Sequence, residues 1–327
     1  MPKLALRPVL AACVTAMAIV IAGCGAPVPN VAPPKVSQSP VPTTSPDNRG
    51  AIRPLARPTG CTSTALTSDA MTQAVAAATP GSKICLFGDM GNVRLTVDQS
   101  GTAQAPIQVM GDGQTAVHGI TVQADYVTIS GINSMNAEAP GISLNGHHIT
   151  VENSTSIAPR KNDGDAVRFW GSDITIRHNT MRNTRNIKAH ADCMQTFATD
   201  EENPASQRIL IDSNRCEDID NTCLIAEGPN SKAGDGSGVG ATTDIRFINN
   251  YCDNRAAQAL QIDDVQNVVF SNNEIAGPIH HAIALQNKST GAAVSGNKLK
   301  NKSIKFEVGI DDSSRPGYHG PDPGGDP

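Results

Sequence analysis

Aromatic side chains are scarce in this chain. Phe, Tyr and Trp together make up 3% of its 327 residues, with a single Trp, and charged residues make up 17%. Large rings supply much of the buried area in an ordinary globular core. Their scarcity excludes a wide aromatic core, so we expect a narrow core of aliphatic side chains.

Positive charge is also in short supply. The chain has 26 Lys and Arg against 31 Asp and Glu. Removal of residues 1–23, which include Lys3 and Arg7, would bring the net charge to about −7. Proteins that bind nucleic acids carry an excess of basic surface. The composition therefore predicts no nucleic-acid partner.

The apolar run Val9–Ile21 is too short for a confident membrane span, which needs about 20 residues. A short run after Lys3 and Arg7 is typical of an export signal. The residues Ile21-Ala-Gly-Cys24 resemble the lipobox of bacterial lipoproteins. This resemblance implies that residues 1–23 are a signal peptide, that Cys24 carries palmitate, and that the protein is anchored at the cell membrane, facing the exterior or the periplasm. Ordinary secretion or an uncleaved anchor is the alternative.

Residues 24–60 are rich in proline, with nine prolines between Gly25 and Thr59. Such a composition cannot bury a core and predicts an extended tether. At about 3.1 Å per residue the tether would span on the order of 100 Å. We therefore expect a target in the cell wall or the periplasm.

A short phrase recurs down the second half of the chain: two apolar residues flank a variable one, and Asn follows three residues later. Degenerate copies that lack the Asn begin at residues 127 and 149. The first residues of successive copies, degenerate and full, lie 22 to 36 residues apart. A recurring short period is typical of stacked repeats. The full copies are Ile174–Asn179, Ile209–Asn214, Ile245–Asn250, Val268–Asn273 and Ala292–Asn297.

A second strand-like segment precedes each phrase. Its apolar residues at 142, 167, 194, 224, 260 and 283 align, and strand alternation turns them inward. The next residue of each segment then points outward: Ser143, Arg168, Gln195, Ile225, Gln261 and Ala284. We expect the repeated asparagines to lie at a bend, where each amide bonds to the next turn in a structural ladder.

At the start of the folded region a capped helix that begins at Ser68-Asp69 is followed by Pro80-Gly81 and by the strand Lys83–Leu86. In this order these segments resemble the start of the pectate-lyase-like superfamily of right-handed parallel β-helices. The resemblance implies an all-β fold, a single-stranded right-handed parallel β-helix with an N-terminal capping helix, over residues 61–300. The segment Ser100–Ile107 also looks like the opening turns of the chondroitinase and alginate-lyase branch. We expect a monomer, and a disordered tail over residues 301–327 because they are rich in Pro, Gly and Asp.

Six cysteines follow Cys24, an even number that suggests disulfides in an exported protein. Counting from the repeat places two pairs at equivalent positions of neighbouring turns, about 4.7–4.9 Å apart. For those two pairs, free thiols are the alternative. The predicted bridges are Cys61–Cys85, Cys193–Cys223 and Cys216–Cys252.

Two turns of the repeat carry insertions, Ala198–Gln207 and Gly228–Thr243. Insertions in successive turns usually project on one side, so we expect them to form the walls of a cleft. The second contains a glycine run, but it does not follow a strand and open a helix, as a nucleotide-binding loop would.

The strongest polar cluster spans residues 160–195, where basic residues outnumber acidic ones. The same counting stacks Asp163 on His190 and Asp165 on Asp192, with Arg168 on Gln195. A basic face on an acidic protein suits an anionic sugar chain. We therefore interpret this cluster as the candidate site, with a polysaccharide or cell-wall glycan as partner.

Three chemistries compete for this cluster. A lyase acting on a uronate needs a base, for which Lys188 and His190 are candidates, and a cation beside the carboxylate, for which Arg168 and Arg185 are candidates. An epimerase would use the same groups and return the proton to the opposite face. A hydrolase would need two carboxylates, Asp165 and Asp192. The Gly-His-Gly and Arg-x-Lys motifs of polygalacturonases are absent, which counts against hydrolysis.

Several alternatives stay open. Asp163, Gln195 and Gln261 are candidate substrate ligands, and Trp170 either stacks on a sugar or covers a turn. The metal requirement is unknown; calcium held by Asp163, Asp165 and Asp192 is an option without the spacing of a calcium loop. The same face could belong to a non-catalytic glycan-binding lipoprotein or to a structural spacer.

Overall fold

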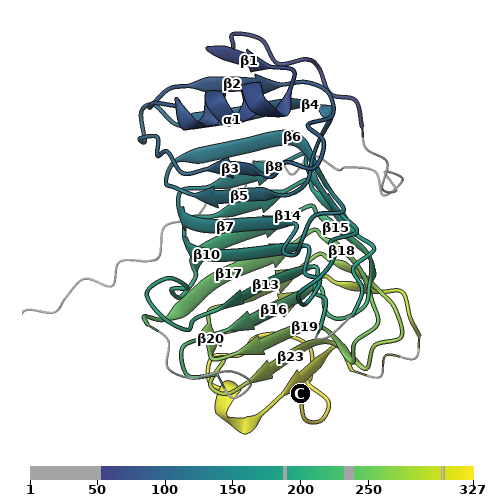
Figure 1. Cartoon of the computed structure of the whole chain (residues 1–327). Coiled ribbons are helices and arrows are strands. Elements are labelled where there is room, and N and C mark those ends of the chain that lie inside the picture. Colours follow the sequence, from purple (N-terminus) through teal and green to yellow (C-terminus); the bar gives the residue numbers. More distant parts are fainter. Residues whose placement is uncertain (1–52, 187–189, 232–238, 303, 305) are drawn as a thin grey trace, which may run out of the picture. The chain divides into compact units, whose positions relative to one another are not determined.

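The computed structural model describes residues 53–186, 190–231, 239–302, 304 and 306–327. The signal peptide, Cys24 and most of the tether lie outside these residues, so their predictions remain untested. No helix in the described ranges is long and apolar enough to cross a membrane. The described chain folds into a parallel β-helix whose coils follow one another from one end to the other (Figure 1).

Each coil contributes a strand to up to three parallel stacks. The first stack holds the repeated phrase and consists of β1 (Ser63–Ala65), β2 (Lys83–Leu86), the first parts of β4 (Ile107–Val117) and β6 (Val127–Met135), β8 (Thr150–Glu152), β11 (Thr175–Arg177), β14 (Gln207–Asp212), β17 (Thr242–Ile248), β21 (Val269–Ser271) and β24 (Ala293–Ser295). The short β20 (Val265–Gln266) pairs with the start of β17.

The second stack follows the repeat asparagines. It consists of the last parts of β4 and β6, then β9 (Thr155–Ile157), β12 (Thr180–Arg182), β15 (Arg215–Ile219), β18 (Tyr251–Asn254), β22 (Glu274–Ala276) and β25 (Lys298–Leu299).

The third stack holds the second predicted strand of each turn. It consists of β3 (Leu95–Val97), β5 (Ile120–Gln123), β7 (Ile142–His147), β10 (Val167–Ser172), β13 (Met194–Phe197), β16 (Leu224–Glu227), β19 (Gln258–Asp263), β23 (His281–Gln286) and β26 (Val308–Ile310).

One narrow core runs inside the three stacks. The predicted inward residues of the third stack are each at most 1% exposed: Ile142, Val167, Met194, Leu224, Leu260 and Ile283. The N-terminal end is closed by α1 (Ser68–Ala76), whose Met71 and Val75 are buried (Figure 1). Its N-cap is Thr67, whose hydroxyl accepts a hydrogen bond from Ala70 N.

The predicted asparagine ladder is confirmed. Asn214 Oδ1 accepts the backbone N–H of Asn179 at 3.0 Å, and its Nδ2 donates to Ile176 O at 2.8 Å. The same pattern repeats through Asn250, Asn273 and Asn297. The residue before each ladder position turns the chain with a positive φ, as at Ser213 (56°). The side chains thus satisfy backbone groups that the bend removes from the strand ladders.

Two of the three predicted disulfide pairings are wrong. Cys61–Cys85 is present, but the other bridges join Cys193 to Cys216 and Cys223 to Cys252, with Cα separations of 5.8 and 6.0 Å. In-register residues of neighbouring parallel strands, such as Cys216 and Cys252, point the same way side by side, so their sulfur atoms do not face each other. Each bridge instead joins the start of a third-stack strand to a second-stack strand of the next coil.

The predicted ends of the domain also change. Leu55 N donates to Asp112 O at 2.8 Å, so the described tether residues before Cys61 pack on the solenoid. The prediction of a disordered tail is wrong for residues 306–327. There β26 extends the third stack, the 3₁₀ turn η1 (Asp312–Ser314) follows, and Gly324 N donates to Val308 O at 2.9 Å. The tail supplies hydrogen-bond partners for backbone groups of the last coil that would otherwise be exposed at a strand edge.

Candidate functional site

The candidate site lies at the start of the third-stack strands β10 and β13. The predicted outward row is confirmed in register: Ser143 pairs with Arg168, Arg168 with Gln195, Gln195 with Ile225, and Ile225 with Gln261. Gln195 and Ile225 are only 4% and 5% exposed, so neighbouring groups cover the middle of this row. Gln261 accepts a hydrogen bond from Gln258 Nε2 at 3.0 Å.

Asp165 and Asp192 meet as predicted. Both side chains are fully buried, and Asp165 Oδ1 accepts the Asp192 N–H at 2.8 Å. Asp192 Oδ1 accepts three further hydrogen bonds, from Asn221 Nδ2 and from the N–H and hydroxyl of Thr222. Sequence reasoning missed Asn221 and Thr222, although the register that aligns Cys193 with Cys223 also places Thr222 beside Asp192.

His190 stands at the surface of this cluster. Its Nδ1 lies 2.8 Å from Asp192 Oδ2, and its side chain is 45% exposed. The hydrogen bond with Asp192 raises the pKa of His190 above its usual 6.5, although burial opposes the shift. The bond to Nδ1 fixes the ring and leaves the Nε2 edge to act on a bound molecule. The other candidate base, Lys188, lies outside the described residues.

Arg168 is bound by two carboxylates of its own coil. Its Nε lies 2.7 Å from Asp165 Oδ2, and its Nη2 contacts Asp163 Oδ2. Burial lowers the pKa of Arg168, opposed by the charge of Asp192. The third guanidinium nitrogen, Nη1, takes no part in these bonds. Arg168 can therefore bind a ligand only through Nη1 or by breaking its contact with Asp163 or Asp165.

Two buried carboxylates side by side disfavour the doubly charged state. Burial, and then the charge of Asp192, raise the pKa of Asp165 to about 8, against the hydrogen bond from Asp192 N–H. Two polar atoms of the site are buried without a hydrogen-bond partner in the described part of the chain, Asp163 Oδ1 and Gln195 Oε1. Such atoms are unusual and suit a donor brought by a ligand or water.

The only group of metal-ligand side chains found in the described ranges is Asp165, His190 and Asp192, whose ligand atoms lie within 4.8 Å of one another. The predicted calcium ligands are Asp163, Asp165 and Asp192, and this group has His190 in place of Asp163. Calcium takes six to eight oxygen ligands, whereas one ligand here is an imidazole and the carboxylate oxygens already accept N–H or O–H donors.

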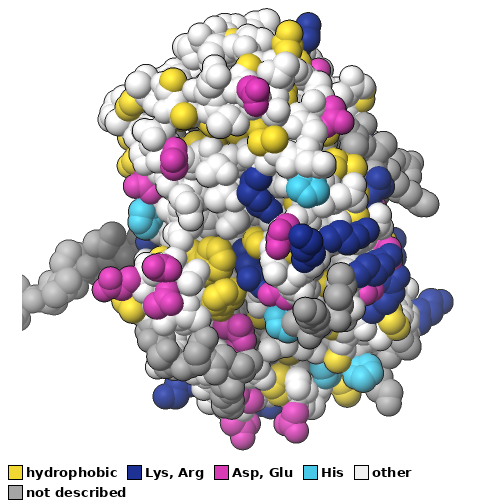
Figure 2. All heavy atoms as spheres, viewed as in Figure 1, with side chains coloured by type: hydrophobic (Ala, Val, Ile, Leu, Met, Phe, Trp, Pro, Cys, Tyr) yellow, Lys and Arg dark blue, Asp and Glu magenta, His cyan; other side chains and the backbone are white. Residues whose placement is uncertain are grey.

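The predicted basic face is largely neutralised by acids from neighbouring coils. Arg185 contacts Asp218, Arg177 lies 2.6 Å from Glu152, and Lys161 lies 3.5 Å from Glu138. Lys and Arg side chains gather on the right-hand side of Figure 2, with Asp and Glu side chains among them. The excess of basic residues in this stretch of the sequence therefore gives a smaller excess of unpaired positive charge on the surface.

Trp170 is buried against the end of β13. It is 6% exposed, its Nε1 donates to Phe197 O at 2.9 Å, and its ring meets the edge of Phe197 at 5.2 Å. Phe197 is the half-buried ring of this pair, and the Arg168 guanidinium lies 5.5 Å from its centroid. Sequence reasoning missed Phe197, which follows Gln195 by two residues and therefore shares its face.

Both insertions leave the third stack at the ends of β13 and β16. The first contacts an earlier coil, since Asn145 Nδ2 donates to Glu202 O at 2.6 Å. In the second, Asn230 O accepts a hydrogen bond from Asn287 Nδ2 of a later coil, and residues 232–238 lie outside the described ranges. The described parts of the two loops thus lean in opposite directions along the solenoid, on the side of the strands away from His190.

The sequence profile described as "Right handed beta helix region" matches residues 118–315. The chain belongs to this right-handed β-helix family. No curated protein matches the sequence.

Three solved structures are similar to this right-handed β-helix. A PL6-family polysaccharide lyase from Pseudopedobacter saltans has 13% identity and a TM-score of 0.51, over 76% of this chain and 65% of its own. An alginate lyase from Paenibacillus sp. str. FPU-7 has 17% identity and a TM-score of 0.44, over 80% and 99%. The PL6-family alginate lyase AlyGC has 13% identity and a TM-score of 0.46, over 76% of this chain and 40% of its own. At these identities the likeness shows the fold alone.

Proposed function

We propose that this β-helix acts on an acidic, uronate-containing polysaccharide, by β-elimination or C5 epimerisation, with His190 as the base. The observation that carries the proposal is the His190–Asp192 pair: a half-exposed imidazole held through Nδ1 by a fully buried carboxylate, beside Arg168. The PL6-family polysaccharide lyase from Pseudopedobacter saltans, whose fold is similar, supports a polysaccharide as the substrate class.

The chemistry follows from these groups. Neutral His190 takes the C5 proton of a uronate through Nε2, and Asp192 stabilises the imidazolium that forms. In elimination, the C5–H electron pair forms the C4–C5 double bond, the C4–O bond breaks, and the leaving oxygen takes a proton from water while the His190 imidazolium releases its proton to water. In epimerisation, water gives a proton to C5 from the opposite face, and the imidazolium again releases its proton to water. In this proposal Arg168 Nη1 pairs with the uronate carboxylate and makes the C5 proton more acidic.

The test is incubation with polygalacturonate, polymannuronate and polyguluronate. We expect unsaturated products, seen by ultraviolet absorbance, or inverted uronates, seen by NMR. His190→Ala should lower the rate about 10²- to 10⁴-fold, whereas His280→Ala, at an exposed histidine near β23, should not. No change in any polymer would overturn the enzymatic proposal.

A non-catalytic glycan-binding protein is the second candidate. The observation that favours it is that Asp163 and Asp165 already hold two of the three guanidinium nitrogens of Arg168. Retention on a uronate polymer, with no turnover and with equal retention of His190→Ala, would favour this candidate.

We also propose that Cys24 is acylated and that residues 24–52 hold the β-helix off the cell membrane, outside the cytoplasm. The support is the Ile21-Ala-Gly-Cys24 phrase and the proline content that follows. Cys24→Ala should move the protein from the membrane fraction to the soluble fraction of the expressing cell and abolish labelling by a palmitate analogue. Labelling that survives this change would contradict the proposal.

A further inference from the structure

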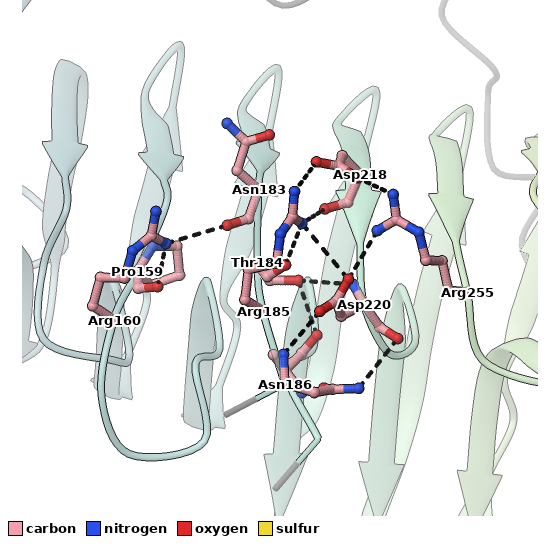
Figure 3. Close-up of polar contacts among 10 residues, drawn as sticks. Pro159, Arg160, Asn183, Thr184, Arg185, Asn186, Asp218, Asp220 and Arg255 are labelled. Atoms are coloured by element: carbon pink, nitrogen blue, oxygen red, sulfur yellow. Dashed lines mark hydrogen bonds and ion pairs between the residues drawn. The ribbon is translucent and has the colours of Figure 1, made fainter. Parts of the chain in front are cut away.

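Three arginines form a row along the turns that join the second stack to the third. Arg160 follows β9, Arg185 follows β12 and Arg255 follows β18. Arg160 and Arg185 lie on neighbouring coils, and Arg255 lies two coils beyond Arg185, with Asp218 and Asp220 on the coil between them (Figure 3). Because parallel strands repeat about every 4.8 Å, the row runs along the solenoid axis.

Arg185 and Arg255 share the two acids between them. Arg185 contacts Asp218 and lies 3.6 Å from Asp220 Oδ1, and Arg255 contacts Asp218 and lies 2.8 Å from the same Asp220 oxygen. These four side chains form a neutral group. The turn that carries His190 is hydrogen-bonded to this group, since Asn186 N donates to Asp220 Oδ2 at 3.0 Å.

Arg160 differs from the other two. Its Nη1 donates to two backbone carbonyls, Pro159 O at 2.9 Å and Asn183 O at 3.5 Å (Figure 3). None of the ion pairs found in the described ranges involves it, and the residue is exposed. Its neighbour Lys161 lies 3.5 Å from Glu138. Arg160 therefore presents a positive charge that its own surroundings do not neutralise.

We propose that this row is a binding strip for the anionic groups of an acidic polysaccharide, with Arg160 as its principal contact and with Asp218 and Asp220 limiting the contribution of Arg185 and Arg255. A guanidinium binds a carboxylate or sulfate through paired N–H groups. The turns that carry Arg160 and Arg185 also carry Asp163–Asp165 and His190–Asp192, so a chain on the strip lies next to the candidate site. The acids within the row and the net charge of −5 disfavour nucleic acid. The substrate class rests on the proposed function; the strip does not depend on catalysis.

The test measures binding of the full chain to immobilised polygalacturonate and polymannuronate at low ionic strength. Arg160→Gln should bind roughly fivefold more weakly, the effect of one exposed ion pair. Asp218→Asn should bind more tightly by a similar factor because it releases Arg185 and Arg255; Asn tolerates the φ of 56° at this position. Arg177→Gln, paired with Glu152 on the first stack, makes the same charge change as Arg160→Gln and should bind like the wild type.

Each outcome bears on the strip. The differences should disappear in about 1 M salt, where screening acts within about 3 Å. Equal binding by Arg160→Gln and the wild type overturns the proposal, as does equal binding of DNA and polyuronate. Weaker binding by Asp218→Asn would also count against it if its thermal unfolding matches the wild type; if Asp218→Asn is unstable, Asp220→Asn takes its place. Turnover with unchanged binding in Arg160→Gln would remove the strip and keep the proposed function. Loss of binding in Arg160→Gln, together with no turnover by the wild type, would support the strip and overturn the enzymatic proposal.

Discussion

At the scale of single residues, the pairing of His190 with Asp192 decides when the site can act as a base. Asp192 raises the pKa of His190, so the ring stays protonated to a higher pH than a free histidine. Since only the neutral ring accepts a proton, we expect the rate to rise with pH and to level off above 6.5. Asp192→Asn should move the midpoint of the profile to lower pH and reduce the plateau rate. An unshifted midpoint would show that another group is the base.

Asp165 makes a separate prediction about stability. Its pKa is 3.8 in the unfolded chain and about 8 in the fold, so the folded protein holds a proton that the unfolded chain releases between these values. Stability from this group is complete below pH 3.8 and is lost as the pH rises toward 8. Relative to Asp165→Asn, the wild type should lose about 1 kcal/mol per pH unit between pH 4 and 6, where His190 is charged in the fold. Urea unfolding at each pH measures the difference, and a pH-independent difference would contradict it.

At the scale of elements, the asparagine ladder holds the bend between the first and second stacks. Asn214→Ala removes Oδ1, which accepts hydrogen bonds from the N–H and Nδ2 of Asn179, and Nδ2, which donates to Ile176 O. The buried Asn179 N–H and Ile176 carbonyl then lose these partners. We expect a loss of about 1–3 kcal/mol in the free energy of unfolding. Ser295→Ala, at an exposed position of β24, should cost far less. Equal losses in the two variants would remove the ladder as a source of stability.

The same elements show which features of the fold could be predicted from the sequence and which could not. Alternation and the repeat predicted the inward rows, the ladder and the contact of Asp165 with Asp192, because stacking coils in register follows directly from residue spacing. The pairing of Cys193 with Cys216 was missed because it depends on which side chains face one another across a corner of the core. The acids that neutralise Arg185 were missed for a related reason: Asp218 and Asp220 lie more than thirty residues away in the sequence and on the adjoining coil in space.

At the scale of the whole molecule, the two ends of the solenoid are covered by different means. The helix α1 closes the first coil, and residues 316–327 fold back on β24 and β26, with His319 N donating to Ala292 O at 2.9 Å. Exposed strand edges promote association between molecules. Deletion of residues 316–327 should lower the thermal midpoint and cause concentration-dependent association, measured by light scattering. A truncated chain that associates no more than the full chain and is equally stable would contradict this role for the tail.

The sequence alone determined the architecture, since the period of apolar residues and asparagines specifies which strands stack and which side chains turn inward. Only the tertiary structure decided which charges of the candidate site are available. Neutralisation depends on distances between side chains of different coils, and the turns between coils, unlike the strands, have no fixed period. Arg168 and Arg185 are therefore engaged by carboxylates, while His190 and Arg160 remain exposed to a ligand.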